Sequence, residues 1–504
     1  MQGRKTFILN GALMGSVGIV LRTATLIFGA YISAEIGAEG VGLNTIIMSV
    51  YAFALTLASS GINLTVTRLV ASHIGAGRDD NIRGTLVGAV IYASIFSVLA
   101  TALLFLFSGV ISTAVINDTR AMPALNILAL SLIPASLGGV FNGYFLARRM
   151  AVLNAVIMLS GQVARIASTV ILLTEFSSDS GTAVIALALG ITISEVLCFL
   201  IALAAFPIIR MRESREKSRV SIRPIAEMAL PLAASAYIRS GLLSLEHSLI
   251  PKRLKERGGS MAEALGNLGT MQGMALPLIL YPMTPLSSIS GLLLPEFAEA
   301  EASNDTVKRA RIAVSAITNT LRYAIITAVI LFVFSEELGY GIYHSYGAGY
   351  FIAILSPVIP IMYLDHVVDS MLKGIGEHVY SMWVNIADSL LSVILVWFLI
   401  PVFGIEGYAL VIIAMELFNF TLSYIRLKRR VNMRLGIMNA VIIPLISAII
   451  GAVSVARAFV IGSSFSPWIF TLKVVFAVSV YICMMILLNT LYNRCKKVVN
   501  RKKE

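Results

Sequence analysis

Long apolar stretches alternate with short polar segments along the whole chain of 504 residues. About fourteen of these stretches approach the ~20 residues that a helix needs to cross the hydrocarbon core of a membrane. Because lipid offers the backbone no hydrogen-bonding partner, each such stretch is predicted to be an α-helix. The predicted spans are residues 7–33, 41–67, 84–110, 122–147, 151–174, 183–207, 225–250, 269–298, 312–335, 347–371, 379–401, 405–427, 435–457 and 467–492.

The polar segments between the spans carry different charges on alternate sides of the predicted membrane. Lys and Arg concentrate on one side, and in membrane proteins that side is the cytoplasm. The sequence therefore predicts a multi-pass protein of the cell membrane with its N- and C-termini cytoplasmic. One basic loop, 251–268, lies on the other side and is predicted to be an external amphipathic segment or a basic collar at a cavity mouth.

Composition excludes several classes of protein. The chain is 58% hydrophobic and 13% charged, whereas soluble domains are about 25% charged. Its net charge of +12 resides in short loops and the C-terminus, as membrane topology requires, so no nucleic-acid partner is expected. The cysteines and histidines show no CxxC, HExxH or metal-ligand spacing, and Gly75-Ala76-Gly77 lacks a nucleotide-binding arrangement. We expect a transporter without catalytic residues, metal or cofactor; a membrane-embedded transferase is the disfavoured alternative.

A polar, strongly basic segment at residues 210–223 divides the chain. The predicted parts are an N-terminal lobe of six helices (1–209), a cytoplasmic linker (210–223), a C-terminal lobe of six helices (224–430), and two additional helices with a basic tail (431–504). The lobes echo each other weakly, since Ser59-Ser60-Gly61 has a counterpart in Ser288-Ile289-Ser290-Gly291. Such duplication is one plan of transporters that hold substrate at the repeat interface.

Arginines lie at the middle of apolar stretches, where a cation costs ~2.5–3.5 kcal/mol. Arg22 and Arg239 occupy nearly the same depth in the first and seventh spans, and Arg165 lies in the fifth. These three residues are predicted to bind an anionic substrate in a cavity, and a structural ion pair is the alternative for each. Small residues share the helical face of Arg22, which a packing seam would also explain: Gly11, Gly15, Gly18, Thr25 and Gly29.

Carboxylates and prolines mark the second half of the chain. Asp365, Asp369, Asp388 and Glu416 lie within predicted spans and are candidates for coupling to Na⁺ or H⁺, although they could simply neutralise the arginines. Lys373 follows Asp369 by one turn and is its expected partner. Prolines break or kink helices, so four of them are predicted to be gating elements: Pro231, Pro277, Pro282 and Pro285.

Several segments together resemble the multidrug/oligosaccharidyl-lipid/polysaccharide (MOP) exporter superfamily. The resemblance is to its polysaccharide biosynthesis branch, which includes stage V sporulation protein B and MurJ-type lipid II flippases. It covers most of the chain and depends on the following residues: Arg22 in a glycine-rich first span, Ser59-Ser60-Gly61 before Arg68, the loop 78–83, Leu230-Pro231, Leu293-Leu294-Pro295-Glu296, and Lys373-Gly374-Ile375-Gly376.

The resemblance implies an all-α polytopic fold with two pseudo-symmetric lobes around a central cavity that opens alternately to either face. The two additional helices would flank the second lobe and form a groove for a lipid tail. The implied cargo is an undecaprenyl-diphosphate-linked sugar, and an anionic diphosphate suits guanidinium groups. Membrane lipids and enzymes of cell-wall or polysaccharide synthesis are the implied partners, in vegetative growth or in sporulation.

The leading hypothesis is therefore a flippase for a lipid-linked oligosaccharide or peptidoglycan precursor that works by alternating access. Its main rival is a MATE-type, cation-coupled multidrug antiporter of the same superfamily, for which about twelve spans and a carboxylate-dominated cavity would be expected. A membrane scaffold for a sporulation or cell-wall complex, which transports nothing, is the third hypothesis.

Overall fold

The computed structural model describes residues 2–76, 80–176, 179–210, 222–303, 305–433, 435–459 and 466–501. The structure is 93% helical, and the described ranges contain no strand. The predicted all-α polytopic class is confirmed. Most of the predicted linker, residues 211–221, lies outside the described residues.

Eleven helices of the described chain are long and apolar enough to cross a membrane, or twelve if a bent pair in α7 counts as one span. The predicted number of fourteen is not confirmed. One reason is the segment Gly15–Gly75, which counts as one helix of 61 residues. At 1.5 Å per residue it would be about 90 Å long, three times the hydrocarbon thickness. A second reason is that predicted span 269–298 consists of short helical pieces.

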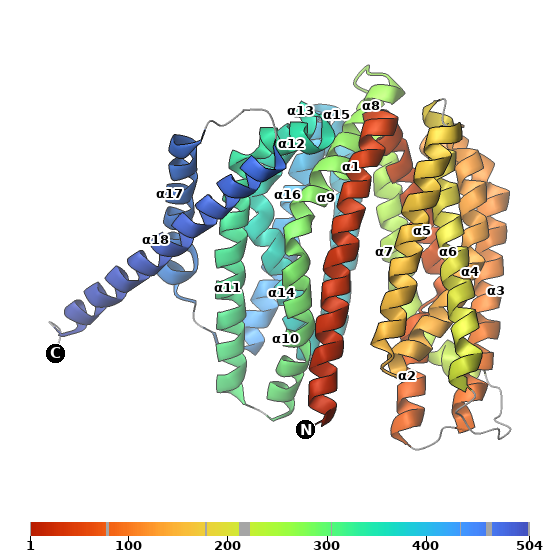
Figure 1. Ribbon diagram of the computed structural model, residues 1–504, viewed down its shortest axis with the longest axis horizontal. Coiled ribbons are helices and arrows are strands. Elements are labelled where there is room, and N and C mark those ends of the chain that lie inside the picture. The colour runs from red at the N-terminus through yellow and green to blue at the C-terminus, as the bar shows by residue number, and fades with distance from the viewer. Residues whose placement is uncertain are drawn as a thin grey trace. The chain divides into compact units, whose positions relative to one another are not determined.

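The chain divides into two compact units, Met1–Gly269 and Thr270–Glu504. The first unit contains α7 and α8 as well as the preceding helices (Figure 1). The division into lobes 1–209 and 224–430 follows sequence repeats rather than contacts and stays a prediction.

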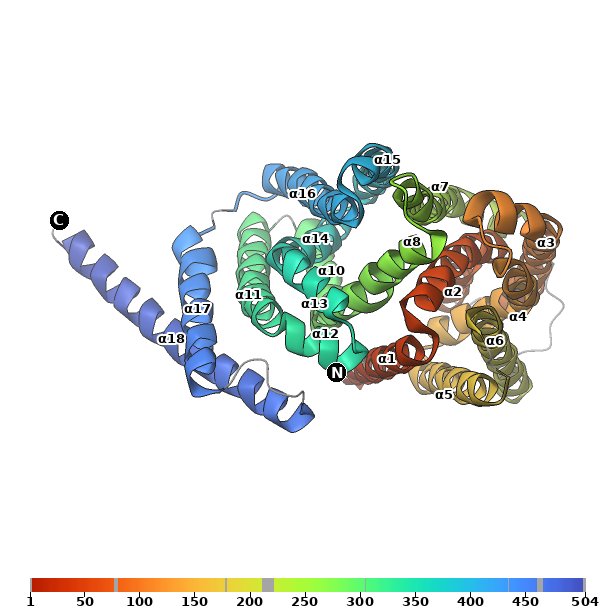
Figure 2. The ribbon, with the colours of Figure 1, turned by 90° about the horizontal axis from the view of Figure 1, so that it is seen from above.

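The first unit is a helical bundle with a large apolar core between α2, α3, α4 and α7 and a smaller one between α5 and α6. Its most deeply buried side chains include Ile62 and Val66 of α2, Tyr144 of α4 and Ile225 of α7. In this unit, α4 packs against α3 and α6, and α6 packs against α5 (Figure 2). The helices are α1 (Gln2–Ser59), α2 (Ile62–Gly75), α3 (Asp80–Val110), α4 (Ala121–Ala147), α5 (Ala151–Phe176), α6 (Ser180–Arg210), α7 (Arg223–Lys255) and α8 (Met261–Leu268), with a π-helix at Ile111–Ile116.

Two breaks interrupt the long N-terminal helix. At Gly37 the φ angle is 69°, in the left-handed region where a side chain is disfavoured. The predicted second span, 41–67, is broken again because Ser60 (φ 43°) and Gly61 (φ 71°) are left-handed. Ser60 is fully buried, and its hydroxyl lies 2.7 Å from the Tyr92 hydroxyl and accepts a hydrogen bond from Tyr237 at 2.6 Å. These tertiary bonds hold a conformation that a serine rarely adopts.

The second unit has its main core between α10, α11, α14 and α16. Phe297, Ile317, Val368 and Leu427 are its representative buried residues, one from each helix. The elements after the π-helix Gly269–Ala275 are α9 (Leu276–Leu280), a 3₁₀ turn (Tyr281–Met283), α10 (Thr284–Ala302), α11 (Thr306–Val333), α12 (Ser335–Tyr343), α13 (Tyr346–Leu355), a 3₁₀ turn (Ser356–Val358), α14 (Ile359–Gly374), α15 (His378–Phe403), α16 (Ile405–Arg430), a π-helix (Met438–Ile442), α17 (Ile443–Ala458) and α18 (Pro467–Arg501).

A buried ion pair fastens α18 to α12. Lys473 Nζ lies 2.8 Å from Glu337 Oε1, with side-chain exposures of 2% and 5%. The ammonium also lies 5.9 Å from the centre of the Phe334 ring. Removing one member of such a pair leaves an uncompensated buried charge, which is far more costly than removing both.

The α1–α8 contact predicts a steric limit at Gly42. A Cβ at this position would collide with the backbone oxygen of Leu265, so Gly42→Ala is expected to lower the free energy of unfolding by about 1–3 kcal/mol. Gly138→Ala is the control, since its added Cβ would meet no described atom within 4 Å. Thermal unfolding in detergent measures both, and equal midpoints would refute the close approach.

The Lys473–Glu337 pair makes a separate prediction about stability. Lys473→Met is expected to cost about 3–5 kcal/mol because it leaves the Glu337 carboxylate buried alone. The double variant Lys473→Met/Glu337→Leu removes both charges and is expected to recover most of the loss. Thermal unfolding of the single and double variants provides the comparison, and strictly additive losses would contradict the pairing.

Candidate functional site

Arg22 lies on an open face of α1. Its side chain is exposed, as is that of Thr25 one turn later. A Cβ added at Gly18 or Gly29 on the same face would meet no described atom within 4 Å. At these two glycines the structure therefore does not show the packing seam that was the alternative explanation for the small residues. The Arg22 side chain therefore lies on the exposed side of the helix.

Arg165 of α5 differs from Arg22 in its burial and in its charged neighbours. Gln162 of α5 donates a hydrogen bond to the Thr25 hydroxyl at 3.3 Å, and each arginine is within one turn of that bond. Arg165 is half-buried, and its electrostatic neighbours are Glu195 of α6 and Tyr51 of α1. This arrangement suits the alternative role, a charge balanced within the helical bundle.

Arg239 lies on α7 and is exposed. Its neighbours fasten α7 to the part of α1 beyond Gly37: Tyr237 donates to Ser60, and Thr56 donates to the Ser240 hydroxyl at 3.4 Å. Gly241 packs against the Phe53 ring. Arg22 and Arg165 thus each lie one helical turn from the hydrogen bond that connects α1 and α5, whereas the residues beside Arg239 contact a different part of the chain.

A polar cavity inside the first unit was not anticipated from the sequence. Its volume is about 450 Å³, and Asn63, Asn142, Asn154 and Glu195 are among the residues that line it. These residues come from α2, α4, α5 and α6. The available signal was the occurrence of asparagines within otherwise apolar stretches, but which of them share a cavity depends on helix packing.

Three of the four predicted coupling carboxylates lie together in the second unit. Asp365 of α14 and Asp388 of α15 are electrostatic neighbours of Glu416 of α16. Asp369 is instead paired with Lys373 at 2.5 Å, the partner that the sequence predicted, and it also contacts the Ser381 hydroxyl. Within the described chain no group of three His, Cys, Asp or Glu residues could hold a metal ion. Whether the cluster binds a cation or a proton stays a prediction.

The predicted gating prolines lie at interruptions of helices. Pro231 adjoins a 41° bend between Arg223–Pro231 and Ala233–Lys255 within α7. Pro277 is in the first turn of α9, Pro282 is in the 3₁₀ turn, and Pro285 is in the first turn of α10. Their rings remove backbone donors where the helix changes geometry. The structure explains the breaks, while the role in gating stays a prediction.

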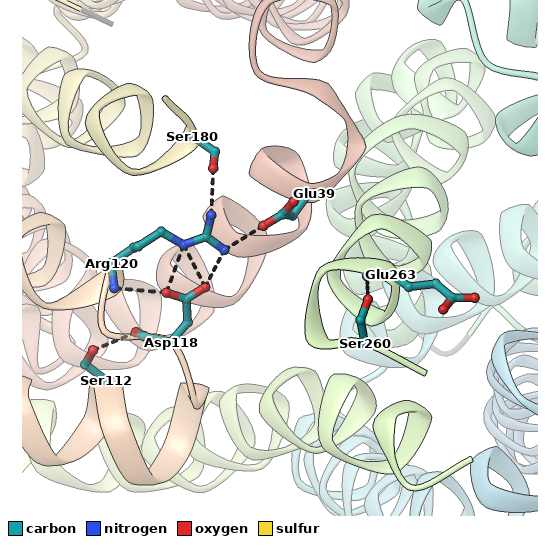
Figure 3. A network of polar contacts seen from close by, with 7 residues as sticks. All are labelled: Glu39, Ser112, Asp118, Arg120, Ser180, Ser260 and Glu263. Carbon is teal, nitrogen blue, oxygen red and sulfur yellow. Dashed lines mark hydrogen bonds and ion pairs between the residues drawn. The ribbon is translucent and has the colours of Figure 1, made fainter. Parts of the chain in front are cut away.

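Charged networks fix the turns outside the membrane spans. Arg120 Nη2 lies 2.6 Å from both Asp118 and Glu39, and Arg120 Nη1 donates to the Ser180 hydroxyl at 2.6 Å (Figure 3). Hydrogen bonding to Asp118, with a smaller contribution from Glu39, raises the pKa of Arg120. The network connects α1, the turn before α4, and the start of α6.

A second network follows the Gly374-Ile375-Gly376 turn. Glu377 accepts hydrogen bonds from Arg426 at 2.9 Å and from Arg430 at 2.6 Å. These bonds, that of Arg426 above all, lower the pKa of the Glu377 carboxyl. The turn between α14 and α15 is thereby attached to the end of α16, next to the helices that carry the carboxylate cluster.

The comparison with known proteins covers most of the chain. A family model described as polysaccharide biosynthesis protein matches residues 8–300. Stage V sporulation protein B of Bacillus subtilis (strain 168) is 23% identical over 425 residues, which cover 81% of each protein. A structure of lipid II flippase MurJ, inward closed, matches with a TM-score of 0.72 at 14% identity, over 96% of this chain and 99% of that one.

A second solved structure is an inward-facing multidrug resistance MATE family transporter of the MOP superfamily. It matches with a TM-score of 0.67 at 15% identity and covers 84% of this chain and 98% of that one. At these identities the solved structures show a shared fold. The resemblance to the polysaccharide biosynthesis branch is confirmed by the family model. Because the family model matches more than half of the sequence, the chain belongs to the polysaccharide biosynthesis protein family.

Proposed function

We propose that the protein is a flippase that moves an undecaprenyl-diphosphate-linked sugar across the cell membrane by alternating access. The cargo would be a lipid-linked oligosaccharide or a peptidoglycan precursor. The observation that carries this proposal is Arg22, an exposed guanidinium in the middle of the first apolar segment, on a face where Gly18 and Gly29 leave open space. Such a charge is costly in lipid and is retained where water or an anion meets it.

The chemistry of the cargo explains the choice of arginine. A diphosphate presents several anionic oxygens, and a guanidinium binds two of them at once in a geometry that a lysine does not reproduce. Arg22 is the primary ligand in this proposal, and Arg239 is a second exposed cation. Arg165 serves mainly to balance Glu195 and to orient α5 beside α1, as its half-buried position supports.

The lipid tail of the cargo would need an apolar surface. A groove of about 460 Å³ lies between α11, α14 and α17, and nearly all of its lining is hydrocarbon. Ile325 and Phe332 of α11 and Leu445 and Ile449 of α17 are among its lining residues. This groove supports the expected role of the C-terminal helices in accommodating a polyprenyl chain.

Coupling in this proposal uses Asp365, Asp388 and Glu416. Three carboxylates on neighbouring helices repel one another when ionised, and a proton or Na⁺ relieves that repulsion. Binding or release of the cation would then shift α14, α15 and α16, with the interruptions at Pro231, Pro277, Pro282 and Pro285 as hinges. The distribution of Lys and Arg supports a cytoplasmic location for both termini in this proposal, and enzymes of glycan synthesis would deliver the cargo on that side.

A cation-coupled multidrug antiporter is the second candidate function. Two observations favour it: the carboxylate cluster would attract cationic drugs, and the fold matches a MATE transporter with a TM-score of 0.67. The exposed Arg22 argues against it, because a guanidinium at mid-membrane repels a cationic substrate. The two candidates therefore differ in the charge of the cargo.

Arg22→Ala is expected to reduce translocation of a fluorescent undecaprenyl-diphosphate sugar in vesicles about 10- to 100-fold, through loss of a charge-assisted contact. Arg22→Lys should restore only part of the activity, because it keeps the charge without the bidentate geometry. Arg223→Ala, which removes an exposed cation paired with Glu227, is the control. Unchanged translocation by a folded Arg22→Ala variant would remove this residue from the mechanism, and transport of a cationic dye instead would favour the antiporter.

Asp388→Asn is expected to abolish the stimulation of flipping by an imposed Na⁺ or pH gradient, since it removes one member of the carboxylate cluster. The same holds for Glu416→Gln. Asp369→Asn is the matched control, because Asp369 is already paired with Lys373. Vesicle assays with and without each gradient give the measurement, and an undiminished gradient response in both cluster variants would locate the coupling elsewhere.

A further inference from the structure

Two ion pairs connect the end of α10 to the start of α11. Lys308 Nζ bonds to Glu299 at 2.9 Å, and Arg309 pairs with Glu301. Farther from the turn between the two helices, α10 carries another acidic residue, Glu296, and α11 carries another basic residue, Arg311. Among the residues that the structure describes, these two take part in no ion pair, although Lys308 lies within electrostatic range of Glu296.

Glu296 and Arg311 instead line one pocket of about 500 Å³ between α10 and α11. The two helices lie side by side in the second unit (Figures 1 and 2). Beyond the charged pair the wall is mostly apolar, with Leu286, Leu293 and Ile312 among its residues. The volume is within the range of sites for small molecules, about 300–1,000 Å³.

The dimensions of the pocket correspond to one leaflet of a membrane. Its lining runs along α11 from Arg311 to Tyr323, which is about 18 Å at 1.5 Å per residue. Half of a ~30 Å hydrocarbon core is about 15 Å. Arg311 lies five residues after the first residue of α11, Thr306, so the charged end is close to the polar interface, on the side predicted to be cytoplasmic.

We propose that this pocket is a binding site for one zwitterionic aminophospholipid, with its phosphate on Arg311, its ammonium on Glu296 and an acyl chain along the apolar wall. The lipid headgroup would thus pair with both charged residues, Arg311 and Glu296. Ser315, one helical turn deeper on the same wall, is placed to donate to an ester oxygen of the glycerol. The residues of this site belong to the second unit, whereas Arg22 belongs to the first.

The charges of the pocket select among membrane lipids. Arg311 binds phosphate through a planar fork of N–H donors, and all phospholipids offer that group. Glu296 selects the rest of the headgroup, because an ethanolamine ammonium donates hydrogen bonds to a carboxylate whereas a choline cannot. A purely anionic headgroup, or the diphosphate of a lipid-linked sugar, is repelled by Glu296. The expected order of affinity is phosphatidylethanolamine, phosphatidylcholine, phosphatidylglycerol.

Native mass spectrometry of the full chain in detergent, titrated with each of the three lipids, tests this order. Arg311→Ala is expected to weaken phosphatidylethanolamine binding at least about tenfold, as loss of a charge-assisted hydrogen bond does. Glu296→Gln should remove the preference for phosphatidylethanolamine over phosphatidylcholine and improve binding of phosphatidylglycerol. Arg223→Ala, which removes an exposed cation paired with Glu227 and outside the pocket, is the control.

A second variant tests the acyl-chain wall without changing charge. Ala316→Trp fills the pocket and is expected to lower binding of all three lipids by a similar factor while both charged residues remain. Equal affinity of the unmodified protein for the three lipids, or no effect of Arg311→Ala, would overturn the proposal. Preference for phosphatidylglycerol or for an undecaprenyl-diphosphate probe would assign the pocket to anionic lipids instead. Each result is independent of whether Arg22→Ala abolishes flipping.

Discussion

Lipid neither hydrates a charge nor completes a backbone hydrogen bond, and this constraint governs every part of the molecule. It makes the regular helix the default and makes each interruption dependent on specific support. Ser60 illustrates the requirement, since its left-handed conformation is accompanied by bonds to Tyr92 and Tyr237. Gly37 is also left-handed, and a glycine adopts this conformation without strain because it has no side chain. Departures from helical geometry are thus confined to places where the bundle itself supplies what lipid does not.

The same constraint sorts the charged groups into distinct kinds. Lys473 and Glu337 are buried and satisfy each other, and Arg120 is satisfied by a network at the helix ends. Arg22 is exposed, on a helical face where Gly18 and Gly29 have open space beside them. Arg22 thus differs from the Lys473–Glu337 pair in its exposure, and the proposed binding of an anion requires such exposure. Composition alone gives no such separation, because Arg22 and Lys473 both interrupt apolar sequence.

Hydropathy predicted most helices closely: the span 151–174 corresponds to Ala151–Phe176, and 405–427 to Ile405–Arg430. Apolar runs bounded by charged turns carry enough information for this. The break at Ser60 was not predicted, because it depends on tyrosines distant in sequence. Likewise, the intramembrane acids could be named individually, but that Asp369 pairs with Lys373 while Glu416 lies among other acids depends on how α14, α15 and α16 are rotated about their axes.

The pairing of Glu337 with Lys473 has a consequence for biosynthesis. The two residues are 136 positions apart, and Lys473 belongs to α18, which is synthesised after α12, the helix that carries Glu337. At 5–20 residues per second, about 7–27 seconds pass between their synthesis. During that interval the glutamate must be accommodated by water, by a proton or by the insertion machinery. A nascent chain that ends before α18 would retain Glu337 without the lysine that neutralises it in the folded protein.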